Sequence, residues 1–97
     1  MLSLTPAQRK HLKSLAHPLK PVVMIGAAGL TEAVLRETAR ALAAHELIKV
    51  RVQNDDRAER EAFLQTICAA LGAAPVQHIG KLLLLYRPAD PPRIQLP

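Results

Sequence analysis

The residues whose types and spacing most clearly suggest a binding site form a short glycine loop, Gly26-Ala27-Ala28-Gly29. This loop lies between an apolar segment and a helix that begins at Thr31. Glycine turns and the first turn of a helix both leave backbone N–H groups without partners, and a helix start carries partial positive charge. Such a site can hold a phosphate, and the two small alanines allow a phosphate backbone to come close. The spacing alone is weak evidence, because any strand-to-helix turn that needs a positive φ also selects glycine.

Basic residues precede this loop without any acidic residue among them. The first carboxylate of the chain is Glu32, the net charge is +5, and the isoelectric point is about 10.0. Mixed charges would serve solubility better than an excess of one sign, so the pattern favours a phosphate-bearing partner, above all a nucleic acid. Besides the loop and Thr31, the candidate contacts are the basic residues Arg9, Lys10, Lys13, His17, Lys20, Lys49, Arg51, Lys81 and Arg87.

Residues that could perform catalysis or hold a metal are not grouped in the sequence. His45-Glu46 begins a zinc-protease pattern, but position 49 is lysine where that pattern needs a second histidine. The four histidines lack metal-ligand spacing, and the only serines, Ser3 and Ser14, have no matching triad. The single cysteine, Cys68, excludes an internal disulfide and lies at the apolar spacing of a buried helix face. We therefore expect no enzyme, no metal and no cofactor.

Seven elements are predicted to position the candidate residues. Capping residues and apolar periodicity predict helices that begin at Thr5, Thr31 and Asp56, the first ending near Ala16 and the third using Glu59 to complete a capping box. Apolar or alternating runs predict strands at 22–25, 47–52, 76–79 and 82–86, the last two joined by a type II′ turn at residues 80–81.

The predicted order, α-β-α-β-α-β-β, defines one domain, residues 1–97, of the α/β class. If both right-handed crossovers step the same way, the second and third helices share one face of a two-layer fold, and the four-stranded mixed sheet has the order 1-2-4-3. Alternation along 47–52 indicates a less covered face where Lys49 and Arg51 emerge, and the sequence leaves open whether the first helix covers part of it. Residues 88–97 form a proline-rich tail, extended or loosely docked.

Composition excludes several other classes of protein. Hydrophobic residues make up 49% of the chain, too many for a disordered tail. Phe63 and Tyr86 are the only aromatic residues, which argues against a sheet that stacks RNA bases on several aromatic rings. No apolar run reaches membrane-span length, and the start of the chain lacks a signal core. We expect a cytoplasmic protein with no membrane partner.

Four blocks of sequence together resemble a known family. The blocks, in order, are residues 17–21 (HPLKP), 26–31 (GAAGLT), 46–50 (ELIKV), and 80–81 (GK) followed by 85–87 (LYR). They resemble the YhbY group, the stand-alone bacterial form of the CRM (chloroplast RNA splicing and ribosome maturation) domain, over about residues 3–97. The resemblance implies a fold similar to the C-terminal domain of translation initiation factor three. It also implies binding to ribosomal RNA in precursors of the large ribosomal subunit, without catalysis.

The loop departs from the pattern of that family at two positions. Family members often have a basic or polar residue inside the loop, whereas this chain has Ala27 and Ala28. Phosphate contacts would therefore depend on backbone N–H groups and on neighbouring lysines such as Lys20. The loop resembles the backbone clamp of KH domains in its physical action, and it lacks the third glycine of a dinucleotide site.

We interpret the chain as a non-enzymatic, monomeric RNA-binding protein. Two alternatives use the same features. A small-molecule phosphate or nucleotide-binding protein would use the same loop and helix start. A protein-interaction module would use the basic face to meet an acidic partner.

Overall fold

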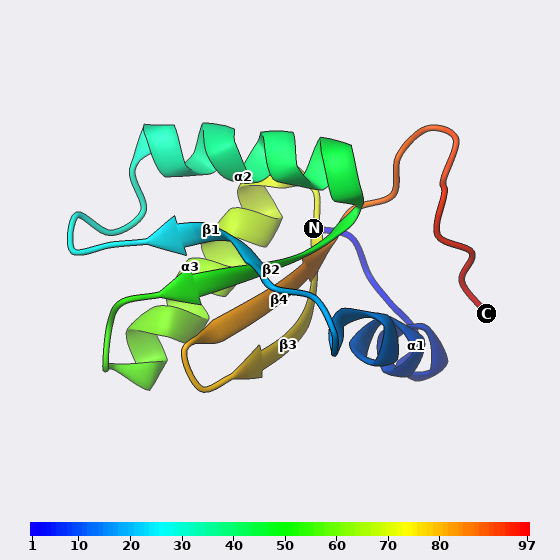
Figure 1. Ribbon diagram of the computed structural model, residues 1–97, viewed down its shortest axis with the longest axis horizontal. Coiled ribbons are helices and arrows are strands. Elements are labelled where there is room, and N and C mark those ends of the chain that lie inside the picture. The colour runs from blue at the N-terminus through cyan, green and yellow to red at the C-terminus, as the bar shows by residue number, and fades with distance from the viewer.

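A computed structural model describes all residues, 1–97 (Figure 1). Its elements are α1 (Pro6–Ala16), β1 (Pro21–Ile25), α2 (Glu32–His45), β2 (Leu47–Val52), α3 (Arg57–Leu71), β3 (Ala74–Ile79) and β4 (Leu82–Tyr86). The strands form one sheet in the order β1-β2-β4-β3, with β1 parallel to β2 and with β4 antiparallel to both of its neighbours. The predicted fold class and strand order are confirmed.

The helices α2 and α3 cover one face of the sheet, as the handedness of the crossovers predicts. Alternate residues of the strands, such as Val50 and Leu83, pack there against Leu42 of α2 and against Ile67 and Cys68 of α3. All five side chains are at most 1% exposed. This cluster is the main hydrophobic core, and it fixes which residues of each strand face the opposite way.

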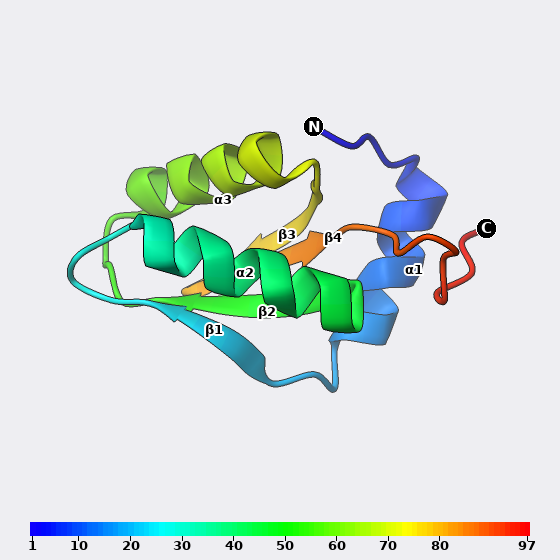
Figure 2. The ribbon, with the colours of Figure 1, turned by 90° about the horizontal axis from the view of Figure 1, so that it is seen from above.

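The helix α1 lies on the opposite face of the sheet, which settles the question that the sequence left open. Its Leu12 and Ala16 pack with Leu84 and Tyr86 of β4 in a second, smaller core. Figures 1 and 2 show α1 at one end of the molecule and the loop between β1 and α2 at the other. Thus α1 adds a partial third layer to the two layers that the sequence predicts, and the sheet face nearer the loop stays uncovered.

Local caps set the ends of the helices. The side chain of Thr5 accepts a hydrogen bond from the Gln8 amide (3.1 Å), and the Gln8 side chain accepts one from the Thr5 amide (3.0 Å), so the first capping box is confirmed. Asp56 caps α3 as expected. The expected box with Glu59 is wrong, because the Glu59 carboxylate instead accepts from the Asn54 side chain (2.7 Å).

The hairpin between β3 and β4 turns at Gly80-Lys81. Gly80 has a φ of 54°, whereas Lys81 has a negative φ. A type I′ turn needs positive φ at both positions and a type II′ turn only at the first, so the geometry agrees with the predicted type II′ turn.

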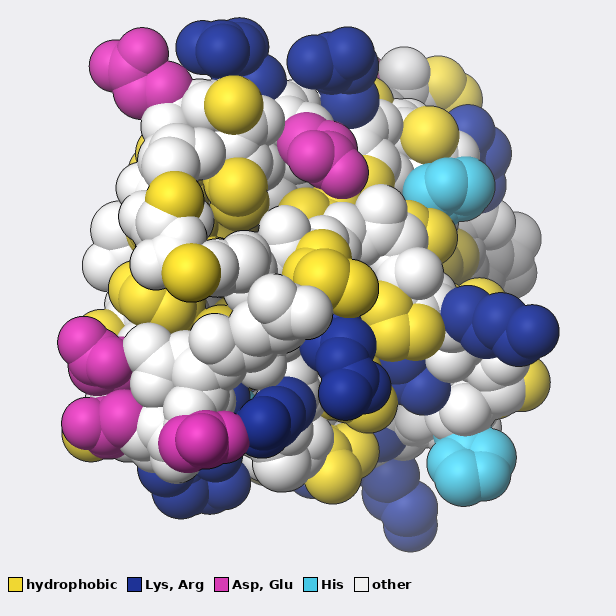
Figure 3. All heavy atoms as spheres, turned by 60° about the vertical axis from the view of Figure 1, so that its left-hand side comes forward, with side chains coloured by type: hydrophobic (Ala, Val, Ile, Leu, Met, Phe, Trp, Pro, Cys, Tyr) yellow, Lys and Arg dark blue, Asp and Glu magenta, His cyan; other side chains and the backbone are white.

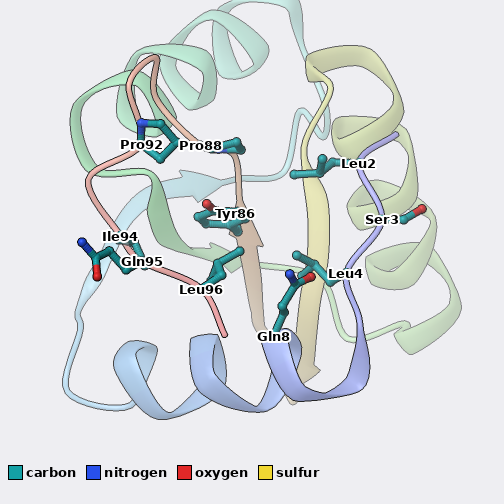
Figure 4. A pocket seen from close by; sticks show the side chains of 10 residues that line it. All are labelled: Leu2, Ser3, Leu4, Gln8, Tyr86, Pro88, Pro92, Ile94, Gln95 and Leu96. Carbon is teal, nitrogen blue, oxygen red and sulfur yellow. The ribbon is translucent and has the colours of Figure 1, made fainter.

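The tail is docked more firmly than the sequence indicates. Its Ile94 and Leu96 join the smaller core, on the side where Leu2 and Leu4 also pack. Figure 4 shows the N-terminal segment and the tail on opposite sides of a cavity of about 630 Å³, with Tyr86 between them. The tail therefore belongs to the folded domain.

Candidate nucleic-acid interface

The glycine loop is exposed and compact. The Gly29 amide donates to the Gly26 carbonyl (3.0 Å), which closes a turn, and Gly29 has a φ of 74°. Gly26 has no positive φ, so only the second glycine is needed for its backbone conformation. The amides of Ala27 and Ala28 donate to no protein acceptor, and both residues are exposed. They are therefore free to donate to an anion.

The start of α2 continues this surface. The Thr31 hydroxyl accepts from the Val34 amide (3.2 Å) and caps the helix, as the sequence predicts. One cap satisfies one of the first amides of a helix, and the others remain available to solvent or to a ligand. The loop and the helix start therefore present amides side by side.

The basic residues of the N-terminal segment lie at the far end of the molecule from the loop (Figures 1 and 2). Lys10, Lys13, His17 and Lys20 are exposed, and Arg9 is half-buried. None of these five side chains has an ion-pair partner, because the nearby chain offers no carboxylate. The structure thus separates the predicted contacts into two groups, which β1 connects.

Three predicted contacts are already bound to protein acceptors. The Lys49 ammonium donates to the carbonyls of His17 (3.2 Å) and Leu19 (2.9 Å) and so holds the turn after α1. Lys81 pairs with Asp55 at 2.7 Å, and the hydrogen bond and charge of Lys81 hold the pKa of Asp55 below its ordinary value. The Arg87 guanidinium donates to the carbonyl of Leu71 at the end of α3 and to the carbonyl of Ala39 within α2.

Arg51 is the exception on the sheet. It lies next to Lys49 on the same face, yet it is exposed and has no hydrogen-bond or ion-pair partner. An unpaired guanidinium on an open sheet face can stack on a flat ring or bind a phosphate.

Basic residues lie on both sides of the sheet, whereas the carboxylates are absent from α1 and from the strands. The eight carboxylates lie on α2 and at its end, on α3, in the turn before α3 and in the tail. The helix α1 and the four strands have none. In Figure 3, which brings the loop end forward, the charged groups visible at the lower right are Lys, Arg and His only. The face that carries α1 therefore has a positive potential close to the loop.

Two features of this surface could not be predicted from the sequence. Met24 lies in a continuous apolar run, yet it is 51% exposed, because β1 is an edge strand and α1 does not reach it. Ile79 is 48% exposed at the opposite edge of the sheet. A run of apolar residues predicts a strand, but it does not reveal which face a distant helix will cover.

Other kinds of site are not assembled by the fold. No three His, Cys, Asp or Glu side chains gather in a way that would hold a metal ion. None of the helices has both the length and the apolar character needed to cross a membrane.

Comparison with known proteins assigns the chain to a family. Residues 4–87 match the CRS1 / YhbY (CRM) domain. The chain is 50% identical over 97 residues to an RNA-binding protein of Haemophilus influenzae, covering 100% of this chain and 98% of that protein. It is 45% identical over 95 residues to a probable RNA-binding protein of Pseudomonas aeruginosa, covering 98% and 91% respectively.

A solved structure agrees in fold as well as in sequence. The solution structure of a hypothetical protein from Staphylococcus aureus superimposes with a TM-score of 0.86 at 32% identity, covering 98% of this chain and 100% of that one. The protein described here belongs to the CRS1 / YhbY (CRM) domain family.

Proposed function

We propose that this protein binds single-stranded RNA without catalysing a reaction on it. The observation that supports this most strongly is the absence of carboxylates from α1 and from the whole sheet. The cations of this region, which have no carboxylate on their own elements, are Arg9, Lys10, Lys13, Lys20, Lys49 and Arg51. A surface of one sign attracts a polyanion and releases its counterions. The RNA-binding names of the relatives agree with this reading.

The position of β1 supports a path for the RNA along this strand. Lys20 immediately precedes this strand and Gly26 immediately follows it. A five-residue strand spans about 16 Å, so an RNA strand that contacts both ends passes along the exposed side of β1. We assign phosphate contacts to the loop amides, Thr31, Lys20 and the basic residues of α1.

The bound cations have a supporting role in this proposal. Lys49 positions the turn that carries His17 and Lys20, and it adds positive charge to the path. Lys81 and Arg87 act chiefly through their protein partners, Asp55 and the helix carbonyls. Arg51, which has no such partner, contacts RNA directly.

A small-molecule phosphate site has less support. A nucleotide pocket usually encloses its ligand, but neither of the two cavities in the molecule includes a residue of the glycine loop. The loop is an open surface, which suits a polymer better than a nucleotide. We therefore expect ATP, GTP and inorganic phosphate to compete weakly with RNA.

Fluorescence anisotropy with labelled single-stranded RNA tests the proposal. We expect binding that weakens steeply with salt and resists millimolar ATP. Binding that nucleotides abolish would favour the small-molecule alternative. An absence of RNA binding, with capture of an acidic protein instead, would favour the interaction module.

We further propose that the RNA is ribosomal RNA in precursors of the large ribosomal subunit, and that the protein acts there as a cytoplasmic monomer. This proposal is supported by the family relationship and by the small basic surface along β1, which suits contact with the phosphates of one RNA strand. Crosslinking in cells followed by sequencing should recover large-subunit RNA. Co-sedimentation with mature ribosomes or with messenger RNA alone would contradict this assignment.

A further inference from the structure

One row of side chains crosses all four strands on the uncovered part of the sheet. Met24 of β1 pairs with Arg51 of β2, Arg51 with Leu82 of β4, and Leu82 with Ile79 of β3. Paired residues at one level of a sheet point to the same side. We call this row the open rung.

The open rung faces away from the main core. Its neighbours in sequence, such as Val23, Val50 and Leu83, point into the core beneath α2 and α3, so the rung residues point to the other side. His78, which precedes Ile79, likewise contacts Glu61 on α3 (3.2 Å). All four rung residues therefore lie on the face that carries α1.

The helix α1 stops short of this rung. Leu84, two residues further along β4 than Leu82, is 1% exposed beneath α1, whereas Met24 is 51% exposed and Ile79 is 48% exposed. Arg51 is also exposed, and Leu82 is half-buried. The rung lies at the end of the sheet where β1 and β2 finish, which is the end where the glycine loop begins.

We propose that the open rung is a platform for unstacked nucleobases of the bound RNA, with the Arg51 guanidinium as the flat group on which a base stacks. This inference rests on the proposed RNA binding and specifies how that site treats the bases. The two aromatic side chains are not available for this role, because Tyr86 is buried beneath α1 and Phe63 packs against the core on the other face. Arginine planes stack bases as aromatic rings do.

The chemistry of the rung favours a nucleotide as its occupant. A base needs an apolar surface on which to lie, and Met24, Leu82 and Ile79 supply one, the methionine thioether being flexible and polarisable. The adjoining phosphates need positive charge and free donors, which Arg51 and the Ala27 and Ala28 amides supply. The strands contribute no carboxylate that would repel the phosphates.

The platform predicts a preference for single strands. Bases in a duplex present only their edges in the grooves, so a duplex offers phosphates to the protein but no free base face. RNA recognition by stacking and RNA recognition by charge can therefore be separated on the same protein.

The test compares Arg51→Lys with a matched control, Arg40→Lys, on the exposed surface of α2. Both substitutions keep the charge, and only the first removes a flat group from the platform. We expect Arg51→Lys to weaken binding to single-stranded RNA by about 5- to 10-fold, on the scale of a lost stacking contact. The affinity of Arg51→Lys for duplex RNA and the salt dependence of its binding should equal those of the wild type. The Arg40→Lys variant should bind both RNAs as tightly as the wild type does.

A second readout observes the platform directly. The chain has two methionines, so methyl-labelled protein gives a simple NMR spectrum in which Met24→Leu assigns the Met24 signal. A base on the rung should shift this methyl resonance through its ring current, and duplex RNA should not.

The outcomes distinguish this inference from the proposed function. If wild-type protein binds single-stranded RNA while Arg51→Lys binds equally well and the Met24 methyl signal stays in place, the platform is wrong and RNA binding stands. If Arg51→Lys weakens binding to duplex and single strand alike, the Arg51 guanidinium contacts the phosphates that both RNAs share and not the bases, which also overturns the platform. If wild-type protein binds neither RNA, the proposed function fails and the platform fails with it.

Discussion

The carboxylate of Glu46, at the end of α2, holds the tail residue Arg93, which is 47 positions later in the chain. Oε1 of Glu46 accepts from the Arg93 backbone amide (2.9 Å) and from its Nε (3.3 Å), and the carboxylate also accepts from the amides of Ala89 and Ile94. The side chain of Glu46 is 1% exposed. The residue has a φ of 66°, a backbone conformation that favours glycine at a helix end. These hydrogen bonds from the tail to the Glu46 carboxylate, which we call the clasp, therefore offset the backbone strain at this position.

Replacing Glu46 should release the tail. We expect Glu46→Gln to lower the free energy of unfolding by about 1–3 kcal/mol, because several donors lose a charged acceptor in a buried place. Glu46→Gly should relieve the backbone strain yet still be less stable than wild type, because the clasp is absent. Urea denaturation gives the stability, and hydrogen exchange of residues 88–97 reports the tail. The exposed Glu37→Gln is the control, and a Glu46→Gly variant as stable as wild type would contradict the clasp.

Stability should fall in acid through the same group. Burial raises the pKa of Glu46, but the hydrogen bonds from Ala89, Arg93 and Ile94 outweigh it, so the folded pKa lies below the ordinary value of 4.5. A lowered folded pKa means that the contribution is complete above about pH 4.5 and is lost as pH falls through the folded pKa. Urea denaturation between pH 7 and 3 should show this loss, and the loss should be smaller in Glu46→Gln. Equal slopes in the two proteins would show that other carboxylates govern the acid limb.

The loop should tolerate a side chain better than it tolerates a negative charge. A Cβ on Gly29 meets only the Phe63 ring at 3.8 Å, an ordinary contact, and Asp and Asn accept positive φ more readily than most residues. We expect Gly29→Asp to fold and to bind RNA about fivefold more weakly than the isosteric Gly29→Asn, because one added charge near a phosphate costs about 1 kcal/mol in water. RNA affinity and thermal melting should be measured together. Equal affinities in two folded variants would remove the loop from the site.

The basic residues of α1 should contribute through charge alone. Changing Arg9, Lys10 and Lys13 together to Gln should weaken binding to every RNA alike and flatten the log–log salt slope by about 2 units, at about 0.7 per phosphate contact. Glutamine nearly preserves helix propensity, so folding should hold.

A control for this triple variant lies on the opposite side of the sheet. Changing Arg36, Arg40 and Arg57 to Gln removes the same charge from α2 and α3. Salt titrations of both triple variants on one RNA separate local contact from net charge. If their slopes coincide, α1 is only a solvated face.

Cys68 should be structural and unreactive. It is fully buried in the main core, and burial raises the pKa of its thiol to about 12, so the thiolate is scarce at pH 8. We expect native protein to resist a thiol reagent that labels the urea-unfolded chain at once. Cys68→Ala should lower stability by about 1 kcal/mol and leave RNA binding unchanged. Rapid labelling of the native protein would contradict this burial.

Much of the fold could be predicted because its signals are local. The box between Thr5 and Gln8, the cap at Thr31 and the turn at Gly80 each involve residues at most three positions apart. Such interactions form whenever the chain bends there, whatever the rest of the molecule does. The sheet order then followed from the handedness of two crossovers and one hairpin.

The sequence by itself determined the elements, their order and the excess of positive charge, because each depends on residue type and short spacing. Only the tertiary structure decided which face α1 covers, and with it the exposure of Met24, the binding of Lys49 to the carbonyls after α1 and the freedom of Arg51. It also decided the pairing of Glu46 with Arg93. The physical reason is that an apolar stripe or a charged group indicates the need for a partner, whereas packing of the whole chain selects which distant partner it meets.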